Sequence, residues 1–207
     1  MGPRECKHLL LFGLERLEYR GYDSAGIALL ESDGLRYTRA VGNLQNLKLA
    51  AGEGPSPATT GLGHTRWATH GGVTEANAHP LAGDDPAEVA IVLNGIVENY
   101  RELRARLGEA GHAFTSETDA ETVTHLIEEY YEGDIVEATR RAFNELEGHF
   151  AFVVIHRDHP GVLVGARVTS ARSSSGSARV RPSSPPTLRR SCARRARCTS
   201  PRTATSL

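Results

Sequence analysis

The first forty residues combine one helical apolar stripe with two strand-like runs. Apolar side chains recur at helical spacing over Leu9–Leu17, which predicts a helix that has ended by Gly21. The segments Asp23–Leu30 and Leu35–Val41 are typical of strands, and a Ser-Asp-Gly turn signal separates them. We therefore expect a hairpin after the first helix, and a surface loop over the Gly/Pro-rich stretch 52–60.

Three later segments have the apolar spacing of helices that pack on a core. They are Glu98–Ala110, the residues that follow Thr118, and Ile135–Leu146. The string from Thr118 to Glu121 has the form of a capping box, in which the two end side chains bond each other's backbone amides. A helix should therefore begin there, with Val123 and Ile127 on its inner face.

Three apolar runs rich in β-branched residues predict strands in the same region. Val89–Leu93 is continuous, which is consistent with a strand buried on both faces, while Phe150–Ile155 and Val162–Val164 flank a turn. Strands at both ends of a block of helices suggest antiparallel sheet layers with helices packed on them. The pattern therefore predicts an α+β fold.

The character of the chain changes after Arg167. Residues 168–207 are mostly Ser, Arg, Ala, Pro and Thr, and they carry a charge of +9, against −10 for residues 1–167. This segment has no apolar periodicity and little to bury, so we expect a domain over 1–167 and a disordered tail over 168–207. The tail lacks lysines and aromatic residues, and no nucleic-acid partner is expected.

The cysteine count and the N-terminal residues point to a compartment. Cys6, Cys192 and Cys198 are three in number, so they imply no disulfide framework, and a reducing, cytoplasmic setting is the default. The apolar run near the start is too short for a signal peptide or a membrane span. No membrane association is expected.

The densest cluster of chemically useful side chains is the string His64-Thr65-Arg66-Trp67-Ala68-Thr69-His70-Gly71-Gly72. Such a mixture is poor core material and suits a pocket that holds a small anionic ligand. Arg66 could bind the carboxylate of an amino acid through two parallel hydrogen bonds, or it could make an ordinary salt bridge. Trp67 could form a pocket wall, or it could simply pack.

Two further sites carry polar groups whose role the local sequence leaves open. Asn94 and Gly95 follow a buried strand, where the side-chain amide and the glycine N–H could stabilise a developing oxyanion. The pair is equally the strongest short-range signal for a hairpin turn. Asp119 could hold an ammonium group, or it could be an acid that the helix dipole favours in the first turn.

The histidines and the N-terminal cysteine offer weaker hypotheses. The spacing of His64, His70 and His79 matches no compact ligand pattern, so we expect neither a metal site nor a cofactor. Cys6 precedes Lys7 and His8, which could lower the pKa of its thiol and make it a nucleophile. Nothing in the sequence directs a base toward it, and an unreactive thiol is the alternative.

Four strings together carry a family resemblance. They are YRGYDSAG at 19–26, HTRWATHGG at 64–72 with NAHP at 77–80, NGIVEN at 94–99, and SETDAE at 116–121. In this order and spacing, residues 9–167 resemble the N-terminal glutaminase domain of the glutamine–fructose-6-phosphate aminotransferases (isomerising), the glucosamine-6-phosphate synthases. The first two strings favour this family over the amidophosphoribosyltransferases and asparagine synthetases, which share its fold.

The resemblance implies a fold, a substrate and a set of site residues. The fold is the αββα sandwich of N-terminal-nucleophile hydrolases, two antiparallel sheets between helical layers, here expected to be incomplete at both ends. The substrate is L-glutamine, whose α-carboxylate pairs with Arg66 and whose α-ammonium group pairs with Asp119. Thr69 and His70 line the site, Asn94 and Gly95 form the oxyanion hole, and Trp67 lies near the exit for ammonia.

The resemblance also implies a cysteine nucleophile that becomes the first residue when methionine is removed. Removing Met1 here would expose Gly2, and neither the family's first strand nor its isomerase domains can be recognised. The tail composition is what an out-of-frame reading of GC-rich DNA tends to give. The leading hypothesis is a truncated, inactive copy of the glutaminase domain. The alternative is a pseudoenzyme that binds glutamine without a nucleophile.

Overall fold

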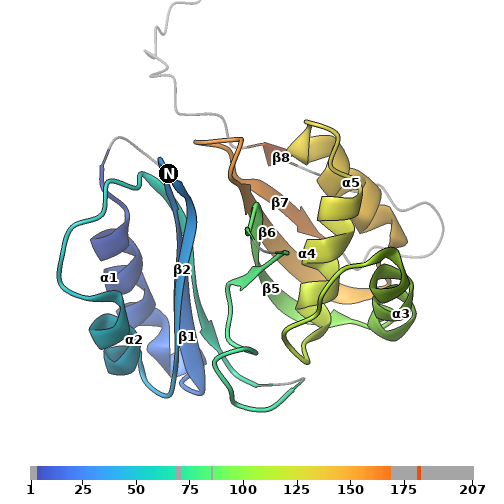
Figure 1. Ribbon diagram of the computed structural model, residues 1–207. Coiled ribbons are helices and arrows are strands. Elements are labelled where there is room, and N and C mark those ends of the chain that lie inside the picture. The colour runs from blue at the N-terminus through green and yellow to red at the C-terminus, as the bar shows by residue number, and fades with distance from the viewer. Residues whose placement is uncertain (1–3, 69–70, 85, 169–180, 183–207) are drawn as a thin grey trace, which may run out of the picture.

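The described residues of the chain form four layers. The computed structural model describes residues 4–68, 71–84, 86–168 and 181–182. Two antiparallel sheets face each other, and helices cover the outer face of each sheet (Figure 1). This helix–sheet–sheet–helix arrangement confirms the predicted α+β class.

The first sheet and its two helices come from the N-terminal third of the chain. In chain order the elements are α1 (Lys7–Leu17), a short 3-10 turn (Glu18–Arg20), β1 (Ser24–Glu31), β2 (Gly34–Val41), α2 (Leu44–Ala51) and β3 (Thr60–Arg66). The strand order is β2-β1-β3. The predicted first helix and hairpin are confirmed, because β1 pairs with β2 along its whole length.

Two elements of this half were not predicted. The short helix α2 begins at Asn43, whose side chain accepts a hydrogen bond from the Asn46 amide. Strand β3 contains Gly61 and Gly63 and shows no clear alternation of apolar and polar residues, so its sequence does not predict a strand. A Cβ at Gly61 would lie 2.6 Å from the Ala28 carbonyl oxygen of β1, so the pairing of the two strands requires glycine there.

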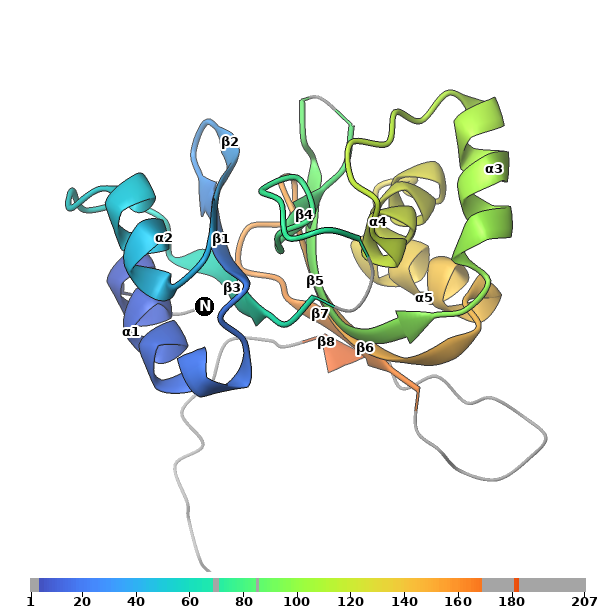
Figure 2. The same cartoon turned by 90° about the horizontal axis from the view of Figure 1, so that it is seen from below.

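The second sheet and three helices come from the rest of the chain. The strands are β4 (Leu81–Ala82), β5 (Val89–Val97), β6 (Gly148–His156), β7 (Val164–Arg167) and β8 (Arg181–Pro182), in that spatial order. The helices are α3 (Tyr100–Ala110), α4 (Asp119–Glu129) and α5 (Ile135–Glu145), and they lie on the outer face of this sheet (Figure 2). None of the described helices is long and apolar enough to cross a bilayer.

The larger apolar core fills the space between the second sheet and its helices. Val123 and Ile127 of α4 are fully buried there, as predicted, together with Leu107 of α3 and Ile91 of β5. The expected capping box at α4 is wrong in its bonding. Thr118 is the N-cap but makes no side-chain cap bond, and its hydroxyl pairs with that of Ser116. Glu121 accepts from the Thr115 and Ser116 amides rather than from the Thr118 amide.

The hairpin turn that local sequence allowed at Asn94-Gly95 does not occur. Strand β5 continues to Val97, and Asn94 and Gly95 lie opposite Ala151 and Phe150 of β6. Gly95 has a φ of +117°, which side chains rarely adopt. Long-range pairing with β6 therefore decides the conformation of this segment.

The predicted tail falls mainly on 169–180 and 183–207, which lie outside the described residues. Three positions of the predicted tail are described, and the disorder of the rest stays a prediction. The Val168 amide donates to the Phe150 carbonyl, and Arg181–Pro182 form β8 beside β7.

The close approach of β6 to Gly95 gives a stability prediction. A Cβ at position 95 would lie 2.1 Å from the His149 carbonyl oxygen, so Gly95→Ala should lower the free energy of unfolding by about 1–3 kcal/mol or more. Gly13→Ala is the control, because a Cβ in α1 there meets nothing within 4 Å, and it should stabilise by about 0.5–1 kcal/mol. Urea unfolding of both variants measures the difference, and equal effects would contradict the strain argument.

Candidate functional site

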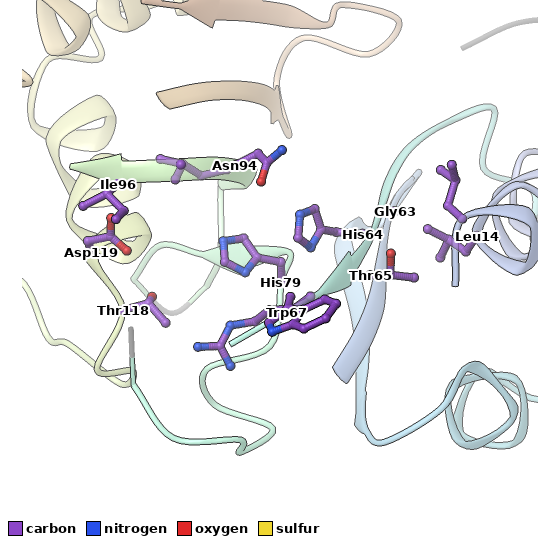
Figure 3. Close-up of a pocket in the computed structure, with 14 residues that line it drawn as sticks. Leu14, Gly63, His64, Thr65, Trp67, His79, Asn94, Ile96, Thr118 and Asp119 are labelled. Carbon is purple, nitrogen blue, oxygen red and sulfur yellow. The ribbon is translucent and has the colours of Figure 1, made fainter. Parts of the chain in front are cut away.

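A cavity of about 440 Å³ lies where the two sheets meet the N-terminal end of α4. Its walls come from α1, β3, β5, His79 in the loop before β4, and the first residue of α4 with its N-cap. Figure 3 shows Asp119 and Thr118 on one side of this space and His64, His79 and Trp67 on the other. The cavity is therefore built from segments that are far apart in the sequence.

Most of the residues singled out in the sequence meet at this cavity. Among the predicted site residues, those that line it are Arg66, Trp67, Asn94, Gly95 and Asp119. The first and last are 53 positions apart in the chain. Thr69 and His70 lie outside the described residues.

Arg66 is the last residue of β3 and is buried, with 4 % of its surface exposed. Its Nη1 donates to the Gly72 carbonyl at 3.2 Å and its Nη2 to the Gly71 carbonyl at 3.5 Å. Burial lowers the pKa of the guanidinium, while the charges of Asp23 and Asp119 act in the opposite direction. The group still stays protonated at neutral pH, because arginine does not lose its proton in proteins. It therefore provides a fixed positive charge on the cavity wall.

Asp119 supplies a buried negative group to the same cavity. It is the first residue of α4, is 5 % exposed, and accepts a hydrogen bond from the Val97 amide at 2.8 Å. This bond joins the start of α4 to the end of β5, the strand that carries Asn94 and Gly95. The positive end of the helix dipole favours a carboxylate there. The cavity therefore contains both a cation and an anion.

Trp67 lies at the mouth of the cavity. Its side chain is 59 % exposed, and its ring lies 5.6 Å from that of Tyr22. A tryptophan that served only as core packing would be buried. The structure therefore favours the pocket-wall interpretation.

His64 and His79 contribute to the cavity in a way that the sequence analysis missed. Their rings lie 4.8 Å apart, and both residues line the cavity. Nδ1 of His64 and both ring nitrogens of His79 are buried without a hydrogen-bond partner among the described residues. Such nitrogens can accept or donate a bond to a bound ligand. No local signal in the sequence pairs the two rings, because the two residues are 15 positions apart and meet only in the folded chain.

Burial also fixes the protonation state of these two histidines. It lowers the pKa of His64 to about 4, with a further contribution from the positive charge of Arg66. Burial likewise holds the pKa of His79 well below its ordinary value, and His64, Arg66 and Arg39 add to the effect. Both rings are therefore neutral near pH 7.

Cys6 has the properties of an unreactive thiol. It precedes α1, is buried, and its amide donates to the Ala58 carbonyl at 2.8 Å. Burial raises the pKa of its thiol, which opposes formation of the nucleophilic thiolate. It does not line the cavity. The geometry therefore favours the alternative to a nucleophile at this position.

Comparison with known proteins identifies the family. Residues 64–172, more than half of the chain, match the glutamine amidotransferase domain. The chain belongs to this family. It is 51 % identical over 173 residues to the glutamine–fructose-6-phosphate aminotransferase (isomerising) of Streptomyces coelicolor, and 49 % identical over 170 residues to that of Thermus thermophilus. Each alignment covers 82 % of this chain but 28 % of the relative, so the chain spans about a quarter of their length.

Solved structures show the same fold. The glutamine phosphoribosylpyrophosphate amidotransferase of B. subtilis matches with a TM-score of 0.68 at 22 % identity, over 80 % of this chain and 35 % of that one. A structure described as the allosteric regulatory enzyme of purine biosynthesis matches with a TM-score of 0.69 at 24 % identity, over 80 % and 36 %. The predicted fold of N-terminal-nucleophile hydrolases is therefore confirmed.

The neutral histidine pair predicts a pH dependence of stability. In the unfolded chain these imidazoles take up protons near pH 6.5, whereas in the folded chain His64 does so only near pH 4. Between these values the unfolded state binds more protons, so the free energy of unfolding should fall as the pH is lowered from about 6.5 toward 4.

Urea unfolding at several pH values between 7 and 4 tests this expectation. His79→Gln should make the pH dependence shallower, because one of the two buried imidazoles is removed. His8→Gln is the control, since His8 is solvent-exposed on α1 and should leave the dependence unchanged. Identical slopes for the parent chain and His79→Gln would contradict the assignment.

Proposed function

We propose that the cavity binds L-glutamine, and that the chain is the glutaminase domain of a glutamine–fructose-6-phosphate aminotransferase. The observation that carries this proposal is the pair of buried opposite charges, Arg66 and Asp119, on one cavity. A free amino acid presents a carboxylate and an ammonium group on the same carbon. A site that selects it needs a cation and an anion across a narrow space. The 51 % identity to an enzyme of that name supports the same assignment.

Arg66 is the proposed ligand of the α-carboxylate. Its guanidinium now donates to two neutral carbonyl groups, Gly71 and Gly72. A carboxylate accepts stronger, charge-assisted bonds than a carbonyl does and matches the planar fork of arginine. Asp119 then receives the α-ammonium group, since only one of its oxygens has a described donor, the Val97 amide.

Asn94 and Gly95 are the proposed oxyanion donors. Attack of a nucleophile on the side-chain amide of glutamine places negative charge on its carbonyl oxygen. The amide group of Asn94 and the backbone N–H of Gly95 are neutral donors, and fixed donors of this kind are most effective in a site with little water. Both residues line the cavity from β5. The released ammonia would leave past Trp67 at its mouth.

We further propose that the 207-residue polypeptide binds glutamine without hydrolysing it. The family reaction needs a thiolate beside the amide carbon. Cys6 does not line the cavity, and no other cysteine occurs among the described residues. Binding without turnover is also the property expected of the pseudoenzyme alternative, so both hypotheses share the tests below.

The binding proposal predicts the effect of removing either charge. Arg66→Ala and Asp119→Asn should each weaken L-glutamine binding by about 100-fold, because charged hydrogen bonds contribute roughly 1.5–3 kcal/mol each. Isothermal titration calorimetry measures the affinity. Arg140→Ala is the matched control, since Arg140 is exposed on α5 and pairs with Glu137. Unchanged affinity in the Arg66 and Asp119 variants would overturn the site assignment.

The activity proposal predicts no glutamate release from glutamine by the purified 207-residue chain. Loss of a catalytic nucleophile commonly lowers kcat by on the order of a million-fold. A heat-inactivated sample gives the background rate. Release well above that background, abolished by Cys6→Ala, would show that Cys6 acts as the nucleophile after all.

A further inference from the structure

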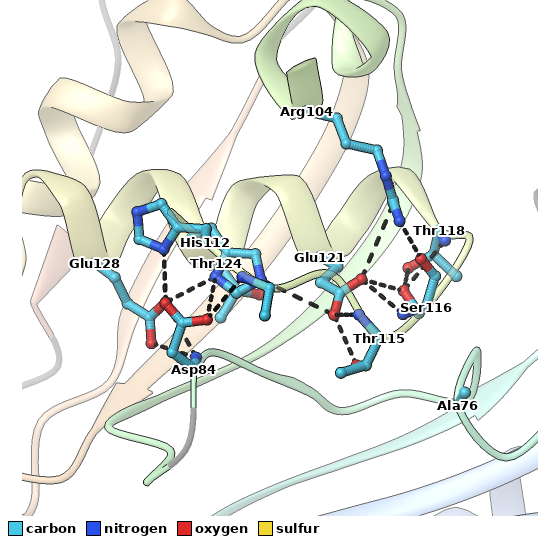
Figure 4. Close-up of polar contacts among 12 residues, drawn as sticks. Ala76, Asp84, Arg104, His112, Thr115, Ser116, Thr118, Glu121, Thr124 and Glu128 are labelled. Carbon is cyan, nitrogen blue, oxygen red and sulfur yellow. Dashed lines mark hydrogen bonds and ion pairs between the residues drawn. The ribbon is translucent and has the colours of Figure 1, made fainter. Parts of the chain in front are cut away.

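A second cluster of chemically active side chains lies away from the cavity. Asp84 follows β4, His112 follows α3, and His125 and Glu128 lie on the second half of α4. One potential ligand atom from each residue lies within 4.8 Å of all the others. Figure 4 shows Asp84, His112 and Glu128 turned toward one another beside α4. Three separate segments of the second sheet and its helices therefore converge at one point.

The distances within this cluster suit a shared cation. Nδ1 of His112 lies 2.7 Å from Oδ2 of Asp84, and Nδ1 of His125 lies 2.9 Å from Oε2 of Glu128. The cross pairs are longer, at 3.9 Å from His112 to Glu128 and 3.8 Å from His125 to Asp84. Four ligand atoms arranged as a tetrahedron about 2.1 Å from one metal ion lie roughly 3.4 Å from each other. That spacing falls between the two short distances and the two long ones. All four ligand atoms already lie within 4.8 Å of one another, so shifts on the order of 1 Å would bring them around one ion.

The second ring nitrogen of His125 favours a metal ligand over a simple hydrogen bond. The side chain is fully buried, and its Nε2 has no hydrogen-bond partner among the described residues. The nearest acidic oxygen is Oε1 of Glu121, at 3.9 Å. If Nδ1 carries the proton and donates to Glu128, the lone pair of Nε2 points toward the Glu121 carboxylate, which is unfavourable. If Nε2 carries the proton, Nδ1 is free to bind a cation, as in most histidine metal sites.

The carboxylates near this histidine are held in place by hydrogen bonds. Glu121 is 1 % exposed and accepts bonds from the backbone and hydroxyl groups of Thr115 and Ser116. Glu128 accepts from the Asp84 amide, and Asp84 accepts from the Ala113 amide. Preorganised carboxylate oxygens beside a buried imidazole are the kind of ligand set that holds a divalent cation.

We propose that Asp84, His112, His125 and Glu128 form a structural site for a divalent transition-metal cation, with Zn²⁺ the best match. Two imidazoles and two carboxylates are ligands that Zn²⁺ accepts in four-coordinate sites. The side chain of Asp84 is 41 % exposed, which gives the ion a path from solvent. The bound ion would join the loop after β4 and the end of α3 to α4. It is independent of the proposed glutamine site.

Zinc binding to the 207-residue chain tests the proposal. The parent for all measurements carries Cys6→Ser, Cys192→Ser and Cys198→Ser, so that no thiol can bind the ion. Competition with a chromogenic chelator should give one bound Zn²⁺ per chain. Asp84→Asn and His112→Gln should each weaken binding at least about 100-fold, since loss of even an outer-shell partner commonly costs 10–100-fold. Both side chains are partly exposed, so these variants should still fold.

The controls are His8→Gln and Asp33→Asn, exposed residues of the same types away from the cluster, and they should leave the affinity unchanged. A second measurement needs no substitution in the cluster. Zn²⁺ added to the cysteine-free parent should shift the imidazole NMR signals of His112 and His125 and leave those of His8 and His64 in place. Equal affinity in the parent and Asp84→Asn, or shifts confined to other histidines, would overturn the proposal.

Discussion

The close contact between the two sheets is the constraint on which the rest of the structure depends. The residues between them include Ala28 and Ala90, whose small side chains let the sheets approach, and the larger Leu62 and Ile155. The loop before β4 also packs closely on the first sheet, because a Cβ at Gly26 of β1 would lie 2.3 Å from the His79 carbonyl oxygen. Strands β3 and β5 contact each other across the two sheets, and both line the cavity together with the start of α4.

Burial of charge gives the cavity its chemical character. Removing a guanidinium or a carboxylate from water costs several kcal/mol unless other groups replace the lost hydration. Here Arg66 is bonded to two carbonyl groups and Asp119 to the Val97 amide, so each charge is supported by neutral backbone groups. A zwitterionic ligand can replace part of that support with opposite charges of its own. The site is therefore arranged for a ligand that carries both signs.

Helix α4 links the cavity to the proposed metal site. Its first residue, Asp119, lines the cavity, and its second half carries His125 and Glu128. Between them, Glu121 binds the segment before the helix rather than capping it. Because polar contacts hold the helix at its start and along its buried face, the position of Asp119 depends on more than apolar packing.

The sequence by itself determined the elements whose signal is local. Helical spacing located α1, α3, α4 and α5, and two strand-like runs with a turn signal between them located the β1–β2 hairpin, because these signals are read from neighbouring residues. Four short motifs also indicated the family and the cavity residues. Only the tertiary structure decided that Asn94-Gly95 continues a strand, since pairing with β6 overrides the turn preference of that dipeptide. It also decided the pairing of His64 with His79 and the cluster around His125. Apart from His125 and Glu128 on the same helix, these contacts join residues 13 to 44 positions apart through the packing of separate elements, which no local pattern records.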